Sequence, residues 1–108
     1  MATAAEPMRP EVLTGFGRTA ATLAHVVTPV DADAVAAAVG GAGPRGALAR
    51  GMGRCYGDAA QNAGGLVLDT SALRSISIDP GSGIATVGAG VVLDDLIRRA
   101  LPLGWFVP

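Results

Sequence analysis

The chain has no lysine, one cysteine and few aromatic residues, and each shortage excludes a class of protein. Without lysine it has no Walker phosphate-binding loop, which requires one. A lone Cys55 excludes an internal disulfide and a cysteine zinc cluster. A formal net charge of -1 leaves no basic footprint for nucleic acid. No apolar run approaches the roughly 18 residues of a transmembrane segment.

What the sequence does have is glycine. The stretch of most interest is residues 49–62, ARGMGRCYGDAAQN, which contains Gly51, Gly53 and Gly57. Glycine lets the backbone approach a ligand closely, and successive N–H groups in such a turn can hold an anion. Arg50 and Arg54 add positive charge suited to phosphate. No third glycine opens a helix at the offset of a dinucleotide fingerprint. Two interpretations therefore stay open from the pattern alone: a diphosphate cradle, or an ordinary glycine-rich connection between strands.

The first half of the chain predicts a strand–helix–strand unit. Residues 1–12 contain two prolines without periodicity, so we expect a loose arm, with the domain itself spanning 13–108. Residues 23–27 read as a strand, and Asp31 as the N-cap of a helix over 31–39 that ends at two glycines. A second strand is expected at 46–50. Such a unit usually gives parallel, right-handed pairing.

The second half predicts a strand, a hairpin and a helix. Residues 66–69 are apolar enough for a buried strand, and the turn-forming residues 79–83 make 75–88 a β-hairpin. Residues 93–101 have helical apolar spacing, and Asp94–Arg98 and Asp95–Arg99 are favourable i,i+4 pairs. The apolar residues 105–107 suggest an edge strand in need of a partner. The fold class expected is α+β, the front part of a longer domain.

Several conspicuous residues have plain structural interpretations. Cys55 has no histidine nearby in sequence, so we favour a packing or loop role over a reactive thiol. His25 is expected to be a structural histidine in its strand. Asp94 and Asp95 are adjacent and do not face each other on a helix, so they read as a solvated helix start. Trp105 and Phe106 are expected in a core rather than on a stacking platform.

The same residues carry a resemblance to a known family. The runs Arg50-Gly51-Met52-Gly53-Arg54-Cys55-Tyr56-Gly57-Asp58, Gly65–Asp69 and Val87–Val91 resemble the front of the FAD-binding domain of the vanillyl-alcohol-oxidase and p-cresol-methylhydroxylase (PCMH) type. Thr14–Arg18 and Leu101–Gly104 are more narrowly similar to the branch that oxidises decaprenylphosphoryl ribose for cell-wall arabinan synthesis. The resemblance covers residues 13–108.

The resemblance implies a site for FAD along the glycine-rich loop. In that family the loop after the second strand wraps the FAD diphosphate, and the amides of Gly53–Tyr56 would point at phosphate oxygens. Thr70 is expected to abut the cofactor as well. Carried over by position, the cofactor-binding residues are Arg50, Gly51, Met52, Gly53, Arg54, Cys55, Tyr56, Gly57, Ala60, Gln61 and Thr70. No catalytic or metal-ligating residue is assigned.

Two departures from the family pattern refine the expectation. Sugar-lactone oxidases of the family have, at the position of Arg54, a histidine that bonds covalently to the flavin, so arginine implies non-covalent FAD. Serine is common at the position of Cys55, and a thiol is the weaker donor.

The resemblance also bears on activity and location. It implies an FAD-dependent oxidoreductase acting on a CH–OH group of a polyprenyl-phosphate sugar, whose flavin-ring and substrate parts lie in a missing C-terminal part. This chain alone is expected to be inactive. A non-catalytic remnant, or a fragment of a lactone or hydroxy-acid oxidase, remains the alternative. The start has no secretory signal, which predicts a cytoplasmic protein, and the resemblance adds a place at the periphery of the membrane.

Overall fold

The computed structural model describes residues 8–108, which form two compact units, one ending at Ala72 and the other running from Leu73 to Pro108. Most of the expected N-terminal arm, residues 1–7, lies outside the described residues. None of the helices in the described part has the length and hydropathy needed to cross a membrane.

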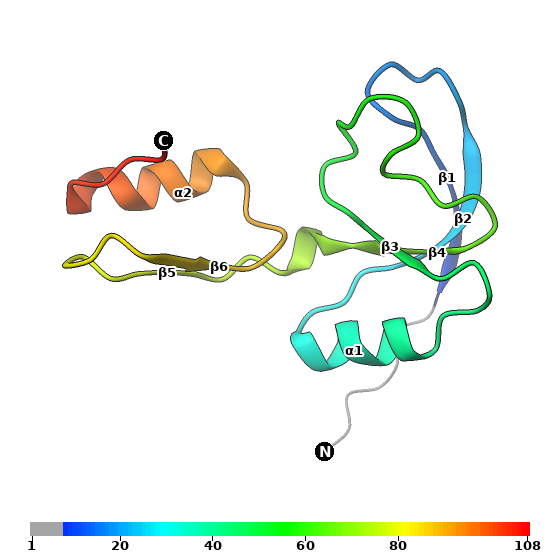
Figure 1. The fold of residues 1–108 in the computed structure, drawn as a ribbon, viewed down its shortest axis with the longest axis horizontal. Coiled ribbons are helices and arrows are strands. Elements are labelled where there is room, and N and C mark those ends of the chain that lie inside the picture. Colours follow the sequence, from blue (N-terminus) through cyan, green and yellow to red (C-terminus); the bar gives the residue numbers. More distant parts are fainter. Residues whose placement is uncertain (1–7) are drawn as a thin grey trace. The chain divides into compact units, whose positions relative to one another are not determined.

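The first unit is a four-stranded sheet with one helix against it. Its strands have the order β1-β2-β4-β3, with β1 antiparallel to β2 and the other neighbours parallel. Figure 1 shows α1 on one side of β3 and β4, and the two long loops on the other. The elements are β1 (Arg9–Leu13), β2 (Thr22–Val27), α1 (Ala32–Gly40), β3 (Ala47–Arg50), β4 (Leu66–Asp69) and the 3-10 turn η1 (Thr70–Ala72).

Strand β4 is the centre of this unit because its three apolar residues are buried on both faces. Val67 packs on one side with Leu13, Ala24 and Val26, and is fully buried. Leu66 and Leu68 point to the other side, where Val27 and the partly buried α1 residues Val35 and Ala38 cover them. A continuous apolar run is what a strand enclosed in a parallel sheet requires.

The helix between β2 and β3 begins where its capping residue predicts. The Asp31 Oδ1 atom accepts a hydrogen bond from the Ala34 N–H at 2.8 Å. Asp33 lies in the first turn, where a carboxylate complements the positive end of the helix dipole. The helix ends at the Gly40–Gly41 pair as expected, with Gly41 as its C-cap.

Two expectations for this unit need correction. Residues 9–13 form β1 instead of a loose arm; Pro10 is tolerated there because β1 is an edge strand, where one N–H can be missing. Strands β2 and β3 are parallel as the strand–helix–strand unit predicts, but they do not pair with each other, because β4 inserts between them.

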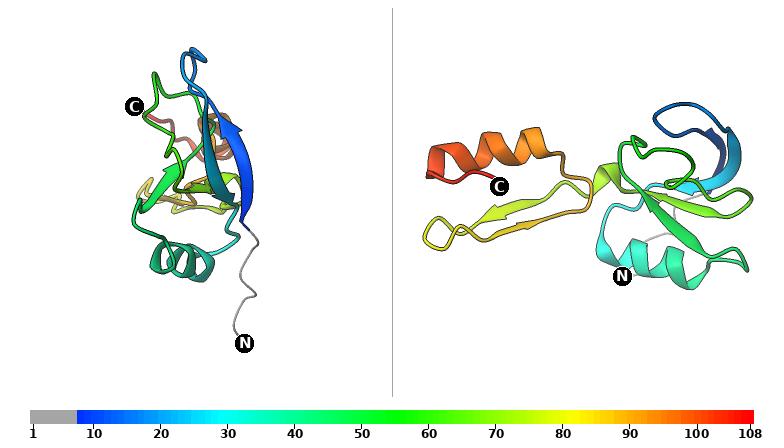
Figure 2. Two further views of the ribbon diagram at one scale, coloured as in Figure 1. Left: turned by 90° about the vertical axis from the view of Figure 1, so that its right-hand side faces the viewer. Right: turned by 45° about the horizontal axis from the view of Figure 1, so that its top comes forward.

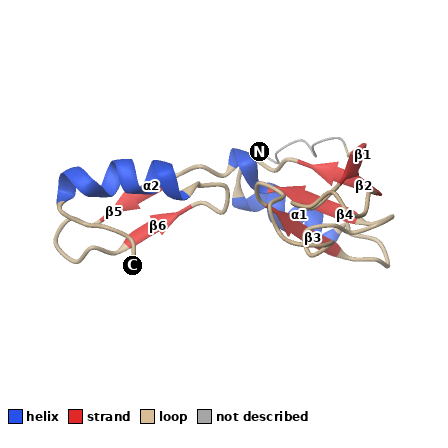
Figure 3. Ribbon diagram, turned by 90° about the horizontal axis from the view of Figure 1, so that it is seen from above, coloured by secondary structure: helices blue, strands red, loops and turns tan. Residues whose placement is uncertain are grey.

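The second unit is a hairpin with a helix running along it (Figures 2 and 3). Strands β5 (Ile76–Ile78) and β6 (Ala85–Val87) pair antiparallel within the predicted hairpin. Helix α2 (Leu93–Ala100) continues as the 3-10 turn η2 (Leu101–Leu103). The Arg98–Asp94 pair forms at 2.9 Å. Asp95 instead pairs with Arg74 at 3.4 Å, so the expected Asp95–Arg99 pair is wrong.

The last residues do not form the expected strand. Residues 105–108 have no regular secondary structure. The Trp105 indole N–H donates to the Pro80 carbonyl at 2.8 Å, and the ring lies against Gly83, where a Cβ would come within 2.8 Å of ring atoms. Phe106 is 67% exposed, so the expectation that it belongs to a core is wrong within this chain.

The hairpin turn gives a prediction on pH. The Asp79 carboxylate accepts hydrogen bonds from the Ser82 hydroxyl at 2.9 Å and from the Gly81 N–H at 3.0 Å. These bonds hold the pKa of Asp79 below its ordinary 3.8, and the bond from Ser82 has the larger effect. The carboxylate therefore stabilises the turn fully above the ordinary pKa, and the effect is lost as pH falls through the lower folded value. We expect the Gly81 amide resonance to shift with that low midpoint. In Ser82→Ala the midpoint should rise; an unchanged midpoint contradicts the assignment.

Candidate functional site

The glycine-rich loop leaves the carboxyl end of β3 and lies beside a second loop, residues 14–21, which joins β1 to β2 (Figure 1). The two loops are far apart in sequence. The Phe16 N–H donates to the Cys55 carbonyl at 2.9 Å, and the Phe16 and Tyr56 rings meet edge to face with centroids 5.8 Å apart. The site is thus a pair of loops, of which the sequence indicated one.

Arg50 points into the pair of loops rather than out of it. Its Nη1 atom donates to the Ala60 carbonyl at 3.0 Å and its Nη2 atom to the Thr14 carbonyl at 2.8 Å. Both bonds are partly buried. The guanidinium expected to face phosphate is therefore engaged with the protein's own backbone.

Gly53 lies directly against this guanidinium. Its φ is +69°, in the left-handed region that favours glycine. A Cβ at this position would overlap the Arg50 guanidinium, approaching Cζ to 2.7 Å. Gly53 is thus required twice, by its backbone conformation and by the side chain packed on it.

The far end of the loop is fixed by Gln61. Its Nε2 atom lies 3.0 Å from the Leu13 carbonyl, 3.2 Å from the Ala20 carbonyl and 2.8 Å from the Thr22 hydroxyl. Ala60 beside it is buried, with 6% exposure. Both residues were expected along the diphosphate, and here the Gln61 side chain ties the loop to residues 13–22.

Gly15 permits the closest approach of the two loops. It is buried, and a Cβ there would overlap the Gly57 carbonyl oxygen and come within 2.9 Å of the Cys55 carbonyl oxygen. Sequence reasoning did not assign it to the site. Its signal was the Gly15-Phe16-Gly17 run, whose glycines mark a tight loop without naming its neighbour.

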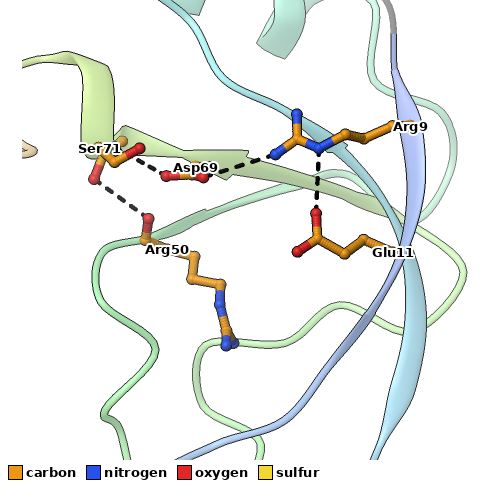
Figure 4. Close-up of polar contacts among 6 residues, drawn as sticks. Arg9, Glu11, Arg50, Asp69 and Ser71 are labelled. Atoms are coloured by element: carbon orange, nitrogen blue, oxygen red, sulfur yellow. Dashed lines mark hydrogen bonds and ion pairs between the residues drawn. The ribbon is translucent and has the colours of Figure 1, made fainter.

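Thr70 lies at the end of β4, beside Arg50 on β3. It is buried, with 7% exposure, and its hydroxyl donates to the Arg50 carbonyl at 3.3 Å. Figure 4 shows the nearby contacts: Asp69 accepts from the Ser71 N–H at 3.0 Å and pairs with Arg9 of β1 at 3.8 Å, while the Arg50 side chain extends away from them. These bonds fix the strand end from which the loop departs.

The rest of the loop is exposed and its polar groups are available. Met52 and Tyr56 are 61% and 82% exposed, and Gly51, Arg54, Cys55 and Gly57 are exposed as well. Backbone N–H groups of residues 51–58 donate no hydrogen bond to any residue that the structure describes. Within residues 8–108, the Arg54 guanidinium likewise has no ion-pair partner.

Other candidate chemistry is sparse in the described residues. No group of three His, Cys, Asp or Glu side chains there could hold a metal ion. Cys55 is an exposed free thiol in the loop. His25, expected to be structural, occupies an exposed position of β2. Its backbone N–H donates to the Gly65 carbonyl at 2.9 Å.

Comparison with known proteins decides the family. A family model described as an FAD binding domain matches residues 23–108, most of the chain. The chain belongs to this FAD-binding-domain family. It is also 49% identical over 112 residues to a decaprenylphosphoryl-β-D-ribose oxidase of Mycolicibacterium smegmatis, called here the mycobacterial relative. That match covers all of this chain but 24% of the relative, so the chain spans about a quarter of the relative's length.

The loop geometry fits the cofactor of this family, FAD. A diphosphate requires several N–H donors and positive charge, and residues 51–58 supply both: N–H donors that bond to no described residue, and Arg54, which has no ion-pair partner within residues 8–108. The positive φ of Gly53 reverses the hand of the backbone, which lets neighbouring N–H groups face the same side. The mixed sheet and helices confirm the expected α+β class, and the family match confirms FAD as the expected cofactor.

Proposed function

We propose that residues 51–57 bind the diphosphate of FAD, with the backbone N–H groups as donors and Arg54 as the charged side chain. The observation that carries this proposal is that the backbone N–H groups of residues 51–58, most of which are exposed residues, donate to no residue that the structure describes. Exposed donors of this kind bind water in the free protein and exchange it for phosphate oxygens. Charge-assisted bonds are about twice as strong as neutral ones, so the exchange favours the anion.

The remaining sequence-predicted residues take supporting roles in this proposal. The side chains of Arg50 and Gln61 donate to backbone carbonyls, and the Thr70 hydroxyl donates to the Arg50 carbonyl. Ala60 offers a carbonyl that is already bonded to Arg50. Met52, Cys55 and Tyr56 are exposed beside the donors and contact the cofactor as apolar or weakly polar walls.

FAD is held without a covalent bond in this proposal. The chain has one histidine, His25, and it lies in β2 rather than in the loop. Arginine at position 54 has no nucleophilic nitrogen at neutral pH, because its guanidinium stays protonated. We expect acid precipitation of the loaded protein to release all of its flavin into the supernatant.

The activity proposed is that of the mycobacterial relative, oxidation of a CH–OH group of a decaprenylphosphoryl ribose. When bound, FAD accepts the two electrons of such an oxidation. Identity of 49% across this chain supports the same substrate class over the lactone and hydroxy-acid oxidases. A polyprenyl chain resides in lipid, so the protein would work at a membrane surface. This chain contributes cofactor binding, and the residues that hold substrate lie in the remaining part of proteins like the relative.

The test is a chimera in which this chain replaces the matching 24% of the mycobacterial relative. We expect the chimera to bind FAD and to reduce it when decaprenylphosphoryl ribose is added. The reduction is measured as a loss of flavin absorbance. Arg54→Gln should weaken FAD binding by about 10- to 100-fold, because one charge-assisted contact contributes roughly 1.5–3 kcal/mol. Isothermal titration with FAD measures the change.

A matched control is Arg99→Gln, an exposed arginine of α2 outside the loop, which should bind FAD normally. Cys55→Ser should preserve or improve binding, because a hydroxyl is a better donor than a thiol. Equal losses in Arg54→Gln and Arg99→Gln would show that the loop is not the diphosphate site. Reduction of the flavin by a sugar lactone, but not by the ribose substrate, would move the protein to the lactone oxidases.

A further inference from the structure

The Arg50 guanidinium joins three separate pieces of backbone at one point. It donates to the Thr14 carbonyl of the 14–21 loop at 2.8 Å and to the Ala60 carbonyl at the far end of the glycine-rich loop at 3.0 Å. Gly53, in the first part of the glycine-rich loop, lies against the same group. A planar fork with donors on both sides suits this arrangement, because its geometry is fixed before any bond forms.

The neighbouring contacts carry the same connection. Gln61 bonds to Leu13, Ala20 and Thr22, and the Phe16 N–H bonds to the Cys55 carbonyl. Residues 13–22 thus brace the glycine-rich loop along its length. They all precede residue 23, where the match to the FAD-binding family model begins.

We propose that Arg50 is a positioning residue for the cofactor loop, which clamps residues 51–60 onto residues 13–22 and does not itself bind phosphate. The proposal rests on the proposed function, because the loop it positions is the diphosphate site. It follows that FAD affinity depends on the segment before the family domain. The donors of residues 51–58 face a ligand in one arrangement only while the clamp holds both ends of the loop.

Lysine cannot replace the arginine in this role. An ammonium is a compact point charge on a flexible stem, and it does not present two donors in a fixed plane to carbonyls on opposite sides. A residue that merely supplied charge to phosphate would tolerate Arg50→Lys. The substitution therefore separates a clamp from a phosphate ligand while the net charge stays constant.

The first experiment uses this chain without FAD. In Arg50→Lys we expect the Phe16 N–H, bonded to the Cys55 carbonyl, to exchange with deuterium about tenfold faster, because a lost clamp frees the loops to open. The amides of β4 should keep their protection. Arg99→Lys is the matched control and should change neither. Unchanged exchange at Phe16 in Arg50→Lys overturns the clamp, whatever the protein does with FAD.

The second experiment measures FAD affinity in the chimera. Arg50→Lys should bind FAD at least about tenfold more weakly, and Gly53→Ala should cost much less in the Arg50→Lys background than alone, since the guanidinium it displaces is gone. Wild-type affinity in Arg50→Lys would assign Arg50 to the phosphates. Strictly additive losses in the double variant would leave Arg50 with neither role. If the unmutated chimera binds no FAD, the proposed function fails, and the exchange experiment alone decides whether Arg50 clamps the loops.

Discussion

We expect Gly53→Val to abolish measurable FAD binding in the chimera, with affinity lowered at least about 100-fold. A β-branched residue at φ +69° is strained by roughly 1–2 kcal/mol, and its Cβ overlaps the Arg50 guanidinium. Relieving the strain moves the backbone away from the shape that presents the N–H groups, and relieving the overlap displaces the Arg50 guanidinium from its carbonyl partners. Restoring that shape on binding costs the strain plus a displaced charge-assisted bond, together about 3–5 kcal/mol. Isothermal titration with FAD measures the loss.

Two glycines outside the loop serve as controls. Gly43→Val introduces a Cβ with no atom within 4 Å and no positive φ, so FAD affinity should stay within about twofold. Gly46→Val carries a φ of +69° into equally open space, so it tests the backbone strain without the clash. We expect Gly46→Val to lower stability and to leave the affinity of the folded protein unchanged. Normal FAD binding by Gly53→Val would show that residues 51–57 are not the diphosphate site.

Gly88→Val is expected to unfold the hairpin of the second unit. A Cβ at Gly88 would overlap the Leu73 carbonyl oxygen and approach its carbon to 2.7 Å and the Arg74 nitrogen to 3.3 Å. These are backbone atoms, so no side-chain rotation relieves the overlap. Moving Gly88 also breaks its 2.8 Å bond to the Ser75 carbonyl. Overpacking of this kind costs about 1–3 kcal/mol or more, a large share of what so small a unit can supply.

The readout is the pairing of β5 with β6. The Ser77–Thr86 and Ile76–Val87 cross-strand contacts should disappear from the nuclear Overhauser spectrum of Gly88→Val. Gly81→Ala, in the turn of the same hairpin, is the control, because its Cβ reaches only the Asp79 Oδ1 atom at 3.5 Å, an ordinary contact. Intact cross-strand contacts in Gly88→Val would mean that residues 73–74 do not pack against Gly88 in solution.

Local signals in the sequence were enough to place most elements. Asp31 stands three residues before the N–H it caps, and Asp79 reaches the turn residues two and three positions on, so these contacts are set by neighbours in the chain. The apolar spacing of residues 93–100 gives α2 for the same reason. The glycine-rich loop was also recognisable, since its composition and its resemblance to the FAD-binding family are properties of one continuous stretch.

Tertiary structure decided what depends on partners distant in sequence. β4 lies between β2 and β3 because its apolar run needs cover on both faces, a condition on the sheet as a whole. Arg50 turns inward because its two carbonyl acceptors, 36 residues before it and 10 residues after it, lie close together in the fold. No local sequence pattern predicts that these two carbonyls come together. Trp105 folds onto Gly83 instead of extending as a strand. Its ring packs where Gly83 has no side chain, and its indole N–H donates to the Pro80 carbonyl. The sequence by itself determined most of the elements and the cofactor class, but not β1 or the path of residues 105–108, because these depend on groups distant in sequence.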